Sequence, residues 1–140
     1  GASVQHVNAH EAQAWCNWAG RRLPTETEWE LAATALPSGD DGVANLDGRI
    51  GGPFPAAAAD GGAAHFIGNV WEWTSSPFLP YPAFAPGAYA EYSQPWFGDH
   101  HVLRGGSWAT RSRLVHPRMR NFYKPGRHDA FAGFRTCARD

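Results

Sequence analysis

The chain of 140 residues has few cysteines, no long hydrophobic run and almost no net charge, and each shortage excludes a class of protein. No apolar stretch approaches the ~18 residues that cross a membrane. A net charge of −1 gives no attraction to nucleic acid or to anionic membranes. The two cysteines, Cys16 and Cys137, form no Cys-x-x-Cys pair, which argues against zinc. Their apolar neighbours favour reduced thiols and a cytoplasmic location, although the sequence leaves a disulfide between them open.

The residues that the chain does have in quantity are glycine, proline and tryptophan, with 16, 11 and 7 copies. This composition predicts one loop-rich domain that packs around aromatic side chains. Two helices are predicted near the N-terminus. The first begins after Asn8, with Glu11 as its capping-box partner, and ends at Gly20. The second begins at Thr25, with Glu28 in the same relation.

Helical spacing and short apolar runs complete the prediction of an irregular α+β fold. The buried stripes of the two helices are predicted to be Ala12, Trp15, Cys16 and Ala19, and Trp29, Ala32, Ala33 and Leu36. Short strands are predicted at Val4 to Val7, His101 to Arg104 and Ala130 to Ala138. The stretch 38–64 is predicted to be a long surface loop, and 75–98 is irregular because its prolines remove backbone donors.

The central stretch of the chain, Gly68 to Thr74, places a single carboxylate between two indoles. Trp71 and Trp73 would share one face of an extended segment, with Glu72 on the other face. If that face is also interior, Glu72 needs a cation or several N–H donors. One interpretation is a structural carboxylate bonded to backbone amides or to an arginine such as Arg104. The other is a Ca²⁺ site that uses Glu72, Asn69 and neighbouring carbonyls, since hard cations take oxygen ligands.

Basic residues are concentrated between Arg111 and Arg127, where they are interleaved with Phe122 and Tyr123. A solvated basic face is one interpretation of such a run. The other is a pocket for a ligand that carries a carboxylate, because an arginine side chain offers a bidentate fork to that group.

Four blocks of the sequence resemble the formylglycine-generating-enzyme (sulfatase-modifying factor) domain. They are Trp18-Ala19-Gly20-Arg21-Arg22-Leu23-Pro24-Thr25-Glu26, Gly68-Asn69-Val70-Trp71-Glu72-Trp73, Leu103-Arg104-Gly105-Gly106-Ser107-Trp108 and Gly133-Phe134-Arg135. The resemblance implies the low-regularity α+β fold of that family, related to C-type lectins, over residues 1–140. Formylglycine-generating enzymes carry two copper-binding cysteines after the third block. No cysteine lies between Ala109 and Asn121 here, so we do not expect that activity.

Three further blocks resemble the C-terminal domain of the sulfoxide synthases of ergothioneine biosynthesis (EgtB type). They are Ser75-Ser76-Pro77-Phe78, the stretch from Tyr89 to Gly98, and Arg120-Asn121-Phe122-Tyr123-Lys124-Pro125. Those enzymes join a sulfur donor to the imidazole C2 of Nα-trimethylhistidine with O₂ and non-haem Fe(II), and the similar selenoneine synthases use a selenium donor. Their iron is held by three histidines on an N-terminal helical-bundle domain. We expect that domain to lie outside this chain and the chain alone to be inactive.

The resemblance assigns roles to individual residues. Tyr89 matches an active-site tyrosine that donates a proton or hydrogen bond in the oxygen-dependent step, and a phenol suits that role. Tyr92 matches the residue that neighbours this tyrosine in the family. Asn121 and Phe122 match the pair that lines the trimethylhistidine pocket, where an aromatic face attracts a quaternary ammonium group. Arg127 matches an arginine that binds the carboxylate of the donor.

One position departs from the family pattern. Enzymes that use γ-glutamylcysteine have Asp where this chain has Tyr123, so the partner for the donor's amino group is missing. The interpretations left open are cysteine as the donor, or a selenosugar whose ring would stack on Tyr123. The alternative to an enzyme is a non-catalytic binding module of the same lectin-like fold, because fold alone does not determine function.

Overall fold

The computed structural model describes residues 3–35, 44–55 and 65–139, and the predicted α+β class is confirmed. The helices are α1 (Ala9–Trp18) and α2 (Glu26–Ala35), and the strands are β1 (Arg21–Arg22), β2 (Trp71–Pro77), β3 (His101–Arg104), β4 (Asn121–Tyr123), β5 (Ala132–Phe134) and β6 (Cys137–Ala138). Three short 3-10 helices are η1 (Ala90–Tyr92), η2 (Gln94–Trp96) and η3 (Ser112–Leu114). The predictions for Leu36 and for most of the 38–64 loop fall outside the described residues.

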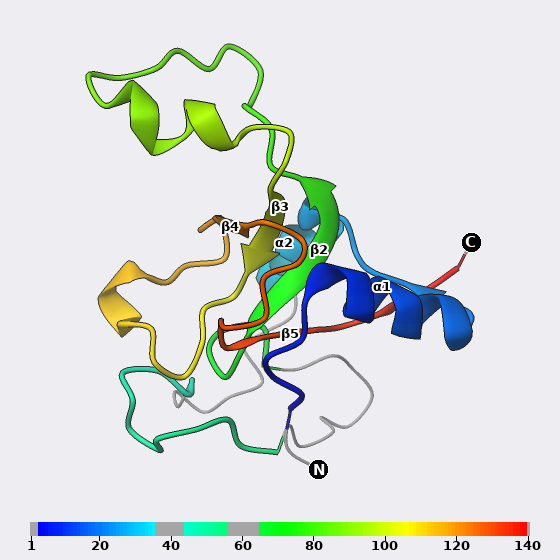
Figure 1. Ribbon diagram of the computed structural model, residues 1–140. Helices are drawn as coiled ribbons and strands as arrows, with labels where there is room; N and C mark the ends of the chain where they lie inside the picture. The colour runs from blue at the N-terminus through cyan, green and yellow to red at the C-terminus, as the bar shows by residue number, and fades with distance from the viewer. Residues whose placement is uncertain (1–2, 36–43, 56–64, 140) are drawn as a thin grey trace.

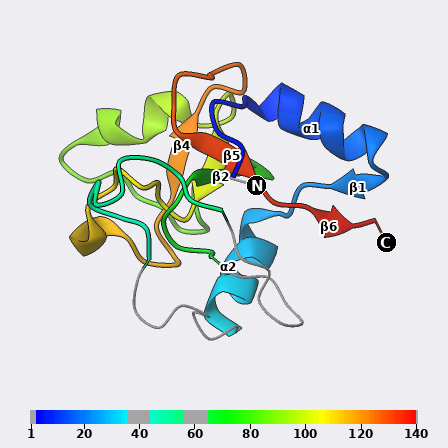
Figure 2. The ribbon, with the colours of Figure 1, turned by 90° about the horizontal axis from the view of Figure 1, so that it is seen from below.

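A four-stranded sheet in the order β4-β3-β2-β5 forms the centre of the molecule, and β1 and β6 form a separate pair. Strand β2 runs antiparallel to β3 and parallel to β5. The two views together show α1 and α2 on opposite faces of this sheet (Figures 1 and 2). Because β2 is covered on both faces, its residues 71–74 are all buried, which is the pattern of a central strand rather than of a strand with one wet face.

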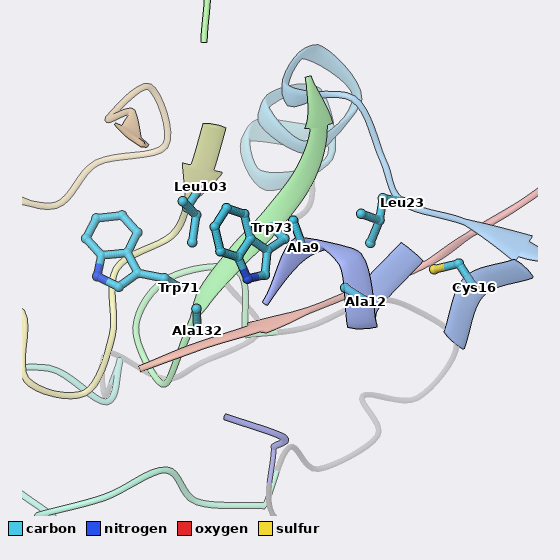
Figure 3. Packing of buried hydrophobic residues seen from close by; sticks show 8 residues of the cluster. All are labelled: Ala9, Ala12, Cys16, Leu23, Trp71, Trp73, Leu103 and Ala132. Atoms are coloured by element: carbon cyan, nitrogen blue, oxygen red, sulfur yellow. The ribbon is translucent and has the colours of Figure 1, made fainter. Parts of the chain in front are cut away.

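The side chains of Trp71, Glu72 and Trp73 alternate in direction along β2, as predicted, and this explains how both helices pack against the sheet. Both indoles lie in a core cluster with α1 residues and Leu103, Leu23 and Ala132 (Figure 3). Trp73 is fully buried, and its Nε1 donates to the carbonyl of Val7 at 2.7 Å. Glu72 points to the other face, toward Trp29 of α2. Both faces of this stretch are therefore interior, which is the case in which Glu72 needs a cation or several N–H donors.

Two local predictions at the N-terminus are wrong. Residues Val4 to Val7 do not form a strand, because His6 adopts a left-handed backbone with φ 62° that breaks an extended segment. Trp15 is 45 % exposed rather than buried, and it leans against Trp18 and Phe134. The buried residues of α1 are Ala9, Ala12 and Cys16, which follow one another at spacings of three and four residues.

The predicted C-terminal strand from Ala130 to Ala138 is divided between two sheets. Its first part is β5, beside β2, and its last part is β6, beside β1. Both cysteines are free thiols. Cys16 is buried, and that burial raises its pKa, whereas Cys137 is partly exposed. Among the described helices, none has the length and apolar character needed to cross a membrane.

The predicted caps of both helices are present. The side chain of Asn8 accepts from the backbone N–H of Glu11, and the Glu11 carboxylate accepts from the N–H of Asn8, each at 2.9 Å. At α2, the carboxylate of Glu28 accepts from the N–H of Thr25 at 2.8 Å and from the fork of Arg22 at 2.9 and 2.8 Å. These donors hold the pKa of Glu28 at about 2, well below its ordinary value of 4.5.

The low pKa of Glu28 predicts how stability changes with pH. Because the folded-state pKa lies below the unfolded one, the contribution is complete above pH 4.5 and is lost as pH falls toward 2. The carboxylate is 43 % exposed, so solvent screening limits the effect to about 1 kcal/mol or less. We expect Glu28→Gln to lower the urea unfolding free energy at pH 6 and to differ little from the parent at pH 2. A difference that is independent of pH would contradict this assignment.

Candidate functional site

The buried carboxylate of Glu72 is held by an arginine and an indole. Arg135 donates from Nε to Oε2 at 2.5 Å and from Nη2 to Oε1 at 2.8 Å, and Trp29 Nε1 donates to Oε2 at 2.6 Å. The structural interpretation of Glu72 is therefore favoured, with one correction. The partner is Arg135 and not Arg104, although Arg104 lies opposite Glu72 on β3. Arg104 turns instead to carboxylates of α2.

The oxygen that Asn69 would offer to calcium is also engaged. Its Oδ1 accepts from Nδ2 of Asn45 at 3.1 Å and from the backbone N–H of Phe54 at 2.9 Å. A calcium ion at this position would have to displace these donors and also Arg135 from Glu72. In the part of the chain that the structure describes, no three His, Cys, Asp or Glu side chains are grouped so that they could hold a metal ion.

The residues predicted to bind trimethylhistidine lie on the edge strand β4. Its three residues, Asn121, Phe122 and Tyr123, pair with β3 and are all partly buried. The Phe122 ring stacks on Phe78, with centroids 4.0 Å apart and an angle of 12° between the rings, and His100 meets it edge-on at 5.9 Å. β4 therefore presents a fixed aromatic wall, and sequence reasoning did not identify Phe78 or His100 as parts of it.

Arg127 lies against Tyr123, the residue of β4 that follows Phe122. Its guanidinium carbon is 4.2 Å from the centre of the Tyr123 ring, so the structure brings these two predicted site residues together. Its fork is engaged by Asp129, with Nε donating to Oδ1 at 2.6 Å. This hydrogen bond lowers the pKa of Asp129 and raises that of Arg127. The sequence analysis did not identify Asp129 as the partner of Arg127, and the only signal for it was an acid two residues after the arginine.

Tyr89 and Tyr92 lie on a different segment, residues 79–97, which we call the aromatic loop. Both are strongly exposed, Tyr89 by 80 % and Tyr92 by 74 %. The loop contains η1 and η2, follows the end of β2, and stands away from the sheet on the side where β4 lies (Figures 1 and 2). The segment that carries the two tyrosines thus lies on the same side of the sheet as β4 but is separate from that strand (Figures 1 and 2).

The base of the aromatic loop is closed by backbone hydrogen bonds. The N–H of Phe78 donates to the carbonyl of His100 at 2.7 Å, and the N–H of Gly98 donates to the carbonyl of Phe78 at 3.0 Å. His100 is buried, and its Nδ1 lies 2.5 Å from a carboxylate oxygen of Asp99. Phe78 therefore belongs both to the base of the loop and to the aromatic wall on β4.

The fold and the edge-strand site define an irregular α+β domain in which loops and short strands carry the polar and aromatic side chains. The chain belongs to the sulfatase-modifying factor enzyme 1-like domain family, whose model matches residues 2–47 and 52–140. It is 45 % identical over 153 residues to a protein of Mycobacterium tuberculosis named hercynine oxygenase, a match that covers 96 % of this chain and 36 % of that protein.

Two further similarities support this placement. The chain is 34 % identical over 123 residues to ergothioneine biosynthesis protein 1 of Schizosaccharomyces pombe, covering 83 % of this chain and 16 % of that protein. The solved structure of Treponema denticola variable protein 1 aligns with a TM-score of 0.62 at 22 % identity, over 98 % of this chain and 71 % of that one, which shows the fold alone. The predicted resemblance to the ergothioneine branch of the family is confirmed. The chain spans about a third of the length of its mycobacterial relative.

Proposed function

We propose that this chain is the substrate-binding part of an Fe(II)- and O₂-dependent enzyme that forms a C–S or C–Se bond at the imidazole C2 of Nα-trimethylhistidine (hercynine). The observation that carries the proposal is the 45 % identity to a hercynine oxygenase along 96 % of the chain. The grouping of Asn121, Phe122, Tyr123 and Arg127 at one edge of the sheet adds a surface suited to such substrates.

The aromatic wall on β4 suits the trimethylammonium group. A quaternary ammonium cannot donate a hydrogen bond and is attracted to the face of an aromatic ring. Phe122 provides such a ring, and its stack on Phe78 keeps it in one orientation. Asn121 begins the same strand and would supply an amide for the polar part of the substrate.

The adjoining pair of Arg127 and Asp129 suits a donor that carries charged groups. A donor carboxylate would take the arginine fork in exchange for Asp129, whose carboxylate would then face the solvent or an amino group of the donor. Cysteine would satisfy both residues. A selenosugar would instead use the Tyr123 ring, which already lies 4.2 Å from the guanidinium.

We propose that the iron is held by a further domain of the same polypeptide, because this chain covers only 36 % of the hercynine oxygenase that it resembles. When bound there, Fe(II) supplies the oxygen chemistry. With a thiol donor, the thiol, the imidazole C2–H and O₂ give the C2 sulfoxide and one water, so that O₂ accepts four electrons. Tyr89 donates a proton or hydrogen bond during this reaction, and its exposure leaves the phenol accessible to a facing domain. We also propose a cytoplasmic location and kinship of the fold with C-type lectins.

The Arg127→Ala substitution tests the assignment of the donor site. In the full-length enzyme we expect it to raise the KM for the donor by about tenfold or more, since a hydrogen bond to a charged group contributes about 1.5–3 kcal/mol. The KM for trimethylhistidine should change much less. Steady-state kinetics with each substrate varied in turn gives both values.

Arg49→Ala is the matched control for that experiment. Arg49 also pairs with an acid two residues away, Asp47, at 3.3 Å and on the surface, but it lies on a segment far from β4 in sequence. The Arg49→Ala variant should leave both KM values unchanged. Equal effects of Arg127→Ala on the two substrates would remove Arg127 from the donor site.

A further inference from the structure

The aromatic loop exposes most of its large side chains. Those more than a third exposed are Leu79, Tyr81, Phe84, Tyr89, Tyr92 and Trp96. Its internal backbone hydrogen bonds join residues only three apart, such as the N–H of Tyr92 to the carbonyl of Tyr89 at 3.2 Å. Contacts of this kind form turns but do not orient a loop against the rest of a protein. Its position must therefore be set by anchors outside the loop.

Arg120 is such an anchor for the beginning of the loop. Its Nη1 donates to the carbonyl of Leu79 at 3.0 Å. Its guanidinium carbon also lies 4.4 Å from the centre of the Tyr81 ring and 4.7 Å from that of Phe78. One planar group thus holds a loop carbonyl and contacts two rings, a combination that lysine cannot reproduce.

The same side chain is fixed from the opposite side by α2. Arg120 Nη2 donates to Oε1 of Glu26 at 2.9 Å, and its Nε lies 2.9 Å from Oε2. The two side chains are only 12 % and 15 % exposed, so water competes weakly for this pair. Glu26 also accepts from Arg104 at 3.0 Å, and Arg104 is almost completely buried. Through Glu26, Arg120 is therefore connected to a buried arginine in the interior of the domain.

We propose that Arg120 is a positioning residue that clamps the aromatic loop to α2 and to β4, and thereby orients Tyr89 and Tyr92 relative to the substrate strand. Arg120 immediately precedes Asn121, the first residue of β4. One residue thus connects the helix, the tyrosine-bearing loop and the strand that lines the candidate site. The catalytic consequence rests on the proposed function, whereas the clamp itself is a property of the chain.

Hydrogen exchange with mass spectrometry tests the clamp without any assay of activity. Arg120→Met keeps an apolar stem, and Arg104 still compensates Glu26, so the variant should fold. We expect the amides of residues 81–97 to exchange about tenfold faster, while those of β2 and β3 keep their rates. Arg118→Met is the control, because Arg118 is 80 % exposed and lies 3.8 Å from its nearest acid, Glu30. The Arg118→Met variant should leave the exchange rate of every peptide unchanged.

Kinetics of the full-length enzyme then test the positioning role. Arg120→Met should lower kcat for the coupled product by about tenfold or more, because a misplaced catalytic group loses rate rather than binding. The donor KM should change by less than about threefold, since Arg127 is untouched. Arg120→Lys should rescue neither the exchange rates nor kcat.

The outcomes separate the clamp from the proposed function. Unchanged exchange in the loop, or an equal rise in β2 and β3, would overturn the clamp whatever the enzyme does. A looser loop with an unchanged kcat would overturn the positioning role and leave the proposed function standing. If the parent enzyme forms no C–S or C–Se product, the proposed function fails, and the exchange data alone still decide whether the clamp exists.

Discussion

In the full-length protein, we expect Tyr89→Phe to lower the rate of coupled product formation by about 10²- to 10⁴-fold, the range of a lost general acid. The substitution keeps the ring and removes only the hydroxyl donor. Because Tyr89 is 80 % exposed in this domain, the change should not alter stability. Oxidation of the thiol or selenol without bond formation should take a larger share of the turnover. Mass spectrometry of the coupled product and of the oxidised donor measures this partition.

Two checks make the result specific to the phenol. The urea unfolding curve of Tyr89→Phe should superimpose on that of the parent protein, which excludes a folding defect. The KM values for both substrates should remain close to those of the parent, because the residues that we propose to bind them are on β4 and at Arg127. An unchanged partition between coupled and uncoupled products would show that Tyr89 has no part in the reaction.

Arg135→Met should destabilise the domain by about 3 kcal/mol, because removing one partner of a buried ion pair leaves the other charge uncompensated. Glu72 is almost fully buried, and after the substitution its carboxylate would keep the hydrogen bond from the indole of Trp29 but lose both bonds from the guanidinium. The double variant Arg135→Met with Glu72→Gln should recover part of the loss, since the uncompensated charge is then absent. Urea denaturation gives all of these free energies.

A second arginine of the C-terminal segment provides the control. Arg139 is exposed, and Arg139→Met should cost about 0.5 kcal/mol or less. If Arg135→Met costs no more than that, the pair with Glu72 does not stabilise the fold. If calcium instead raises the stability of the parent protein and Glu72→Gln abolishes that effect, the calcium interpretation of Glu72 and Asn69 replaces the structural one.

Features that depend on neighbouring residues were predictable from the sequence. The capping boxes at Asn8 and Thr25, the left-handed stop at Gly20 and the strand from His101 to Arg104 all appear as predicted. Each rests on contacts within a few residues or on a continuous apolar pattern. The left-handed backbone of His6 has no such local signal. It interrupts the stretch from Val4 to Val7, whose composition favours a strand.

Features that depend on long-range contacts were not predictable in the same way. Glu72 was expected to need a cation or several N–H donors, but its partner, Arg135, lies 63 residues away and directly follows β5, the strand beside β2. The clamp by Arg120 joins Glu26, 94 residues earlier, to the aromatic loop. Pairings of this kind follow from the order of strands in the sheet, and a single sequence does not specify that order.

The sequence indicated the substrates and the role of Tyr89 only through a family resemblance, although the basic run that ends at Arg127 already suggested a pocket for a carboxylate. Tyr89, Asn121 and Arg127 carry no pattern that would identify a trimethylhistidine enzyme from composition or spacing. The structure adds what the motifs omit, which is that Phe78 supports Phe122 and that Asp129 engages Arg127. These neighbours come from elements that converge only in the folded chain.

The most direct test of the account is product analysis with the full-length protein that contains this chain. The protein is incubated with Fe(II), O₂, Nα-trimethylhistidine and, in parallel, cysteine, γ-glutamylcysteine or a selenosugar. We expect a product in which sulfur or selenium is bonded to the imidazole C2, with cysteine or the selenosugar preferred over γ-glutamylcysteine, and no product without trimethylhistidine. Consumption of no donor and recovery of unaltered trimethylhistidine in all three reactions would contradict it.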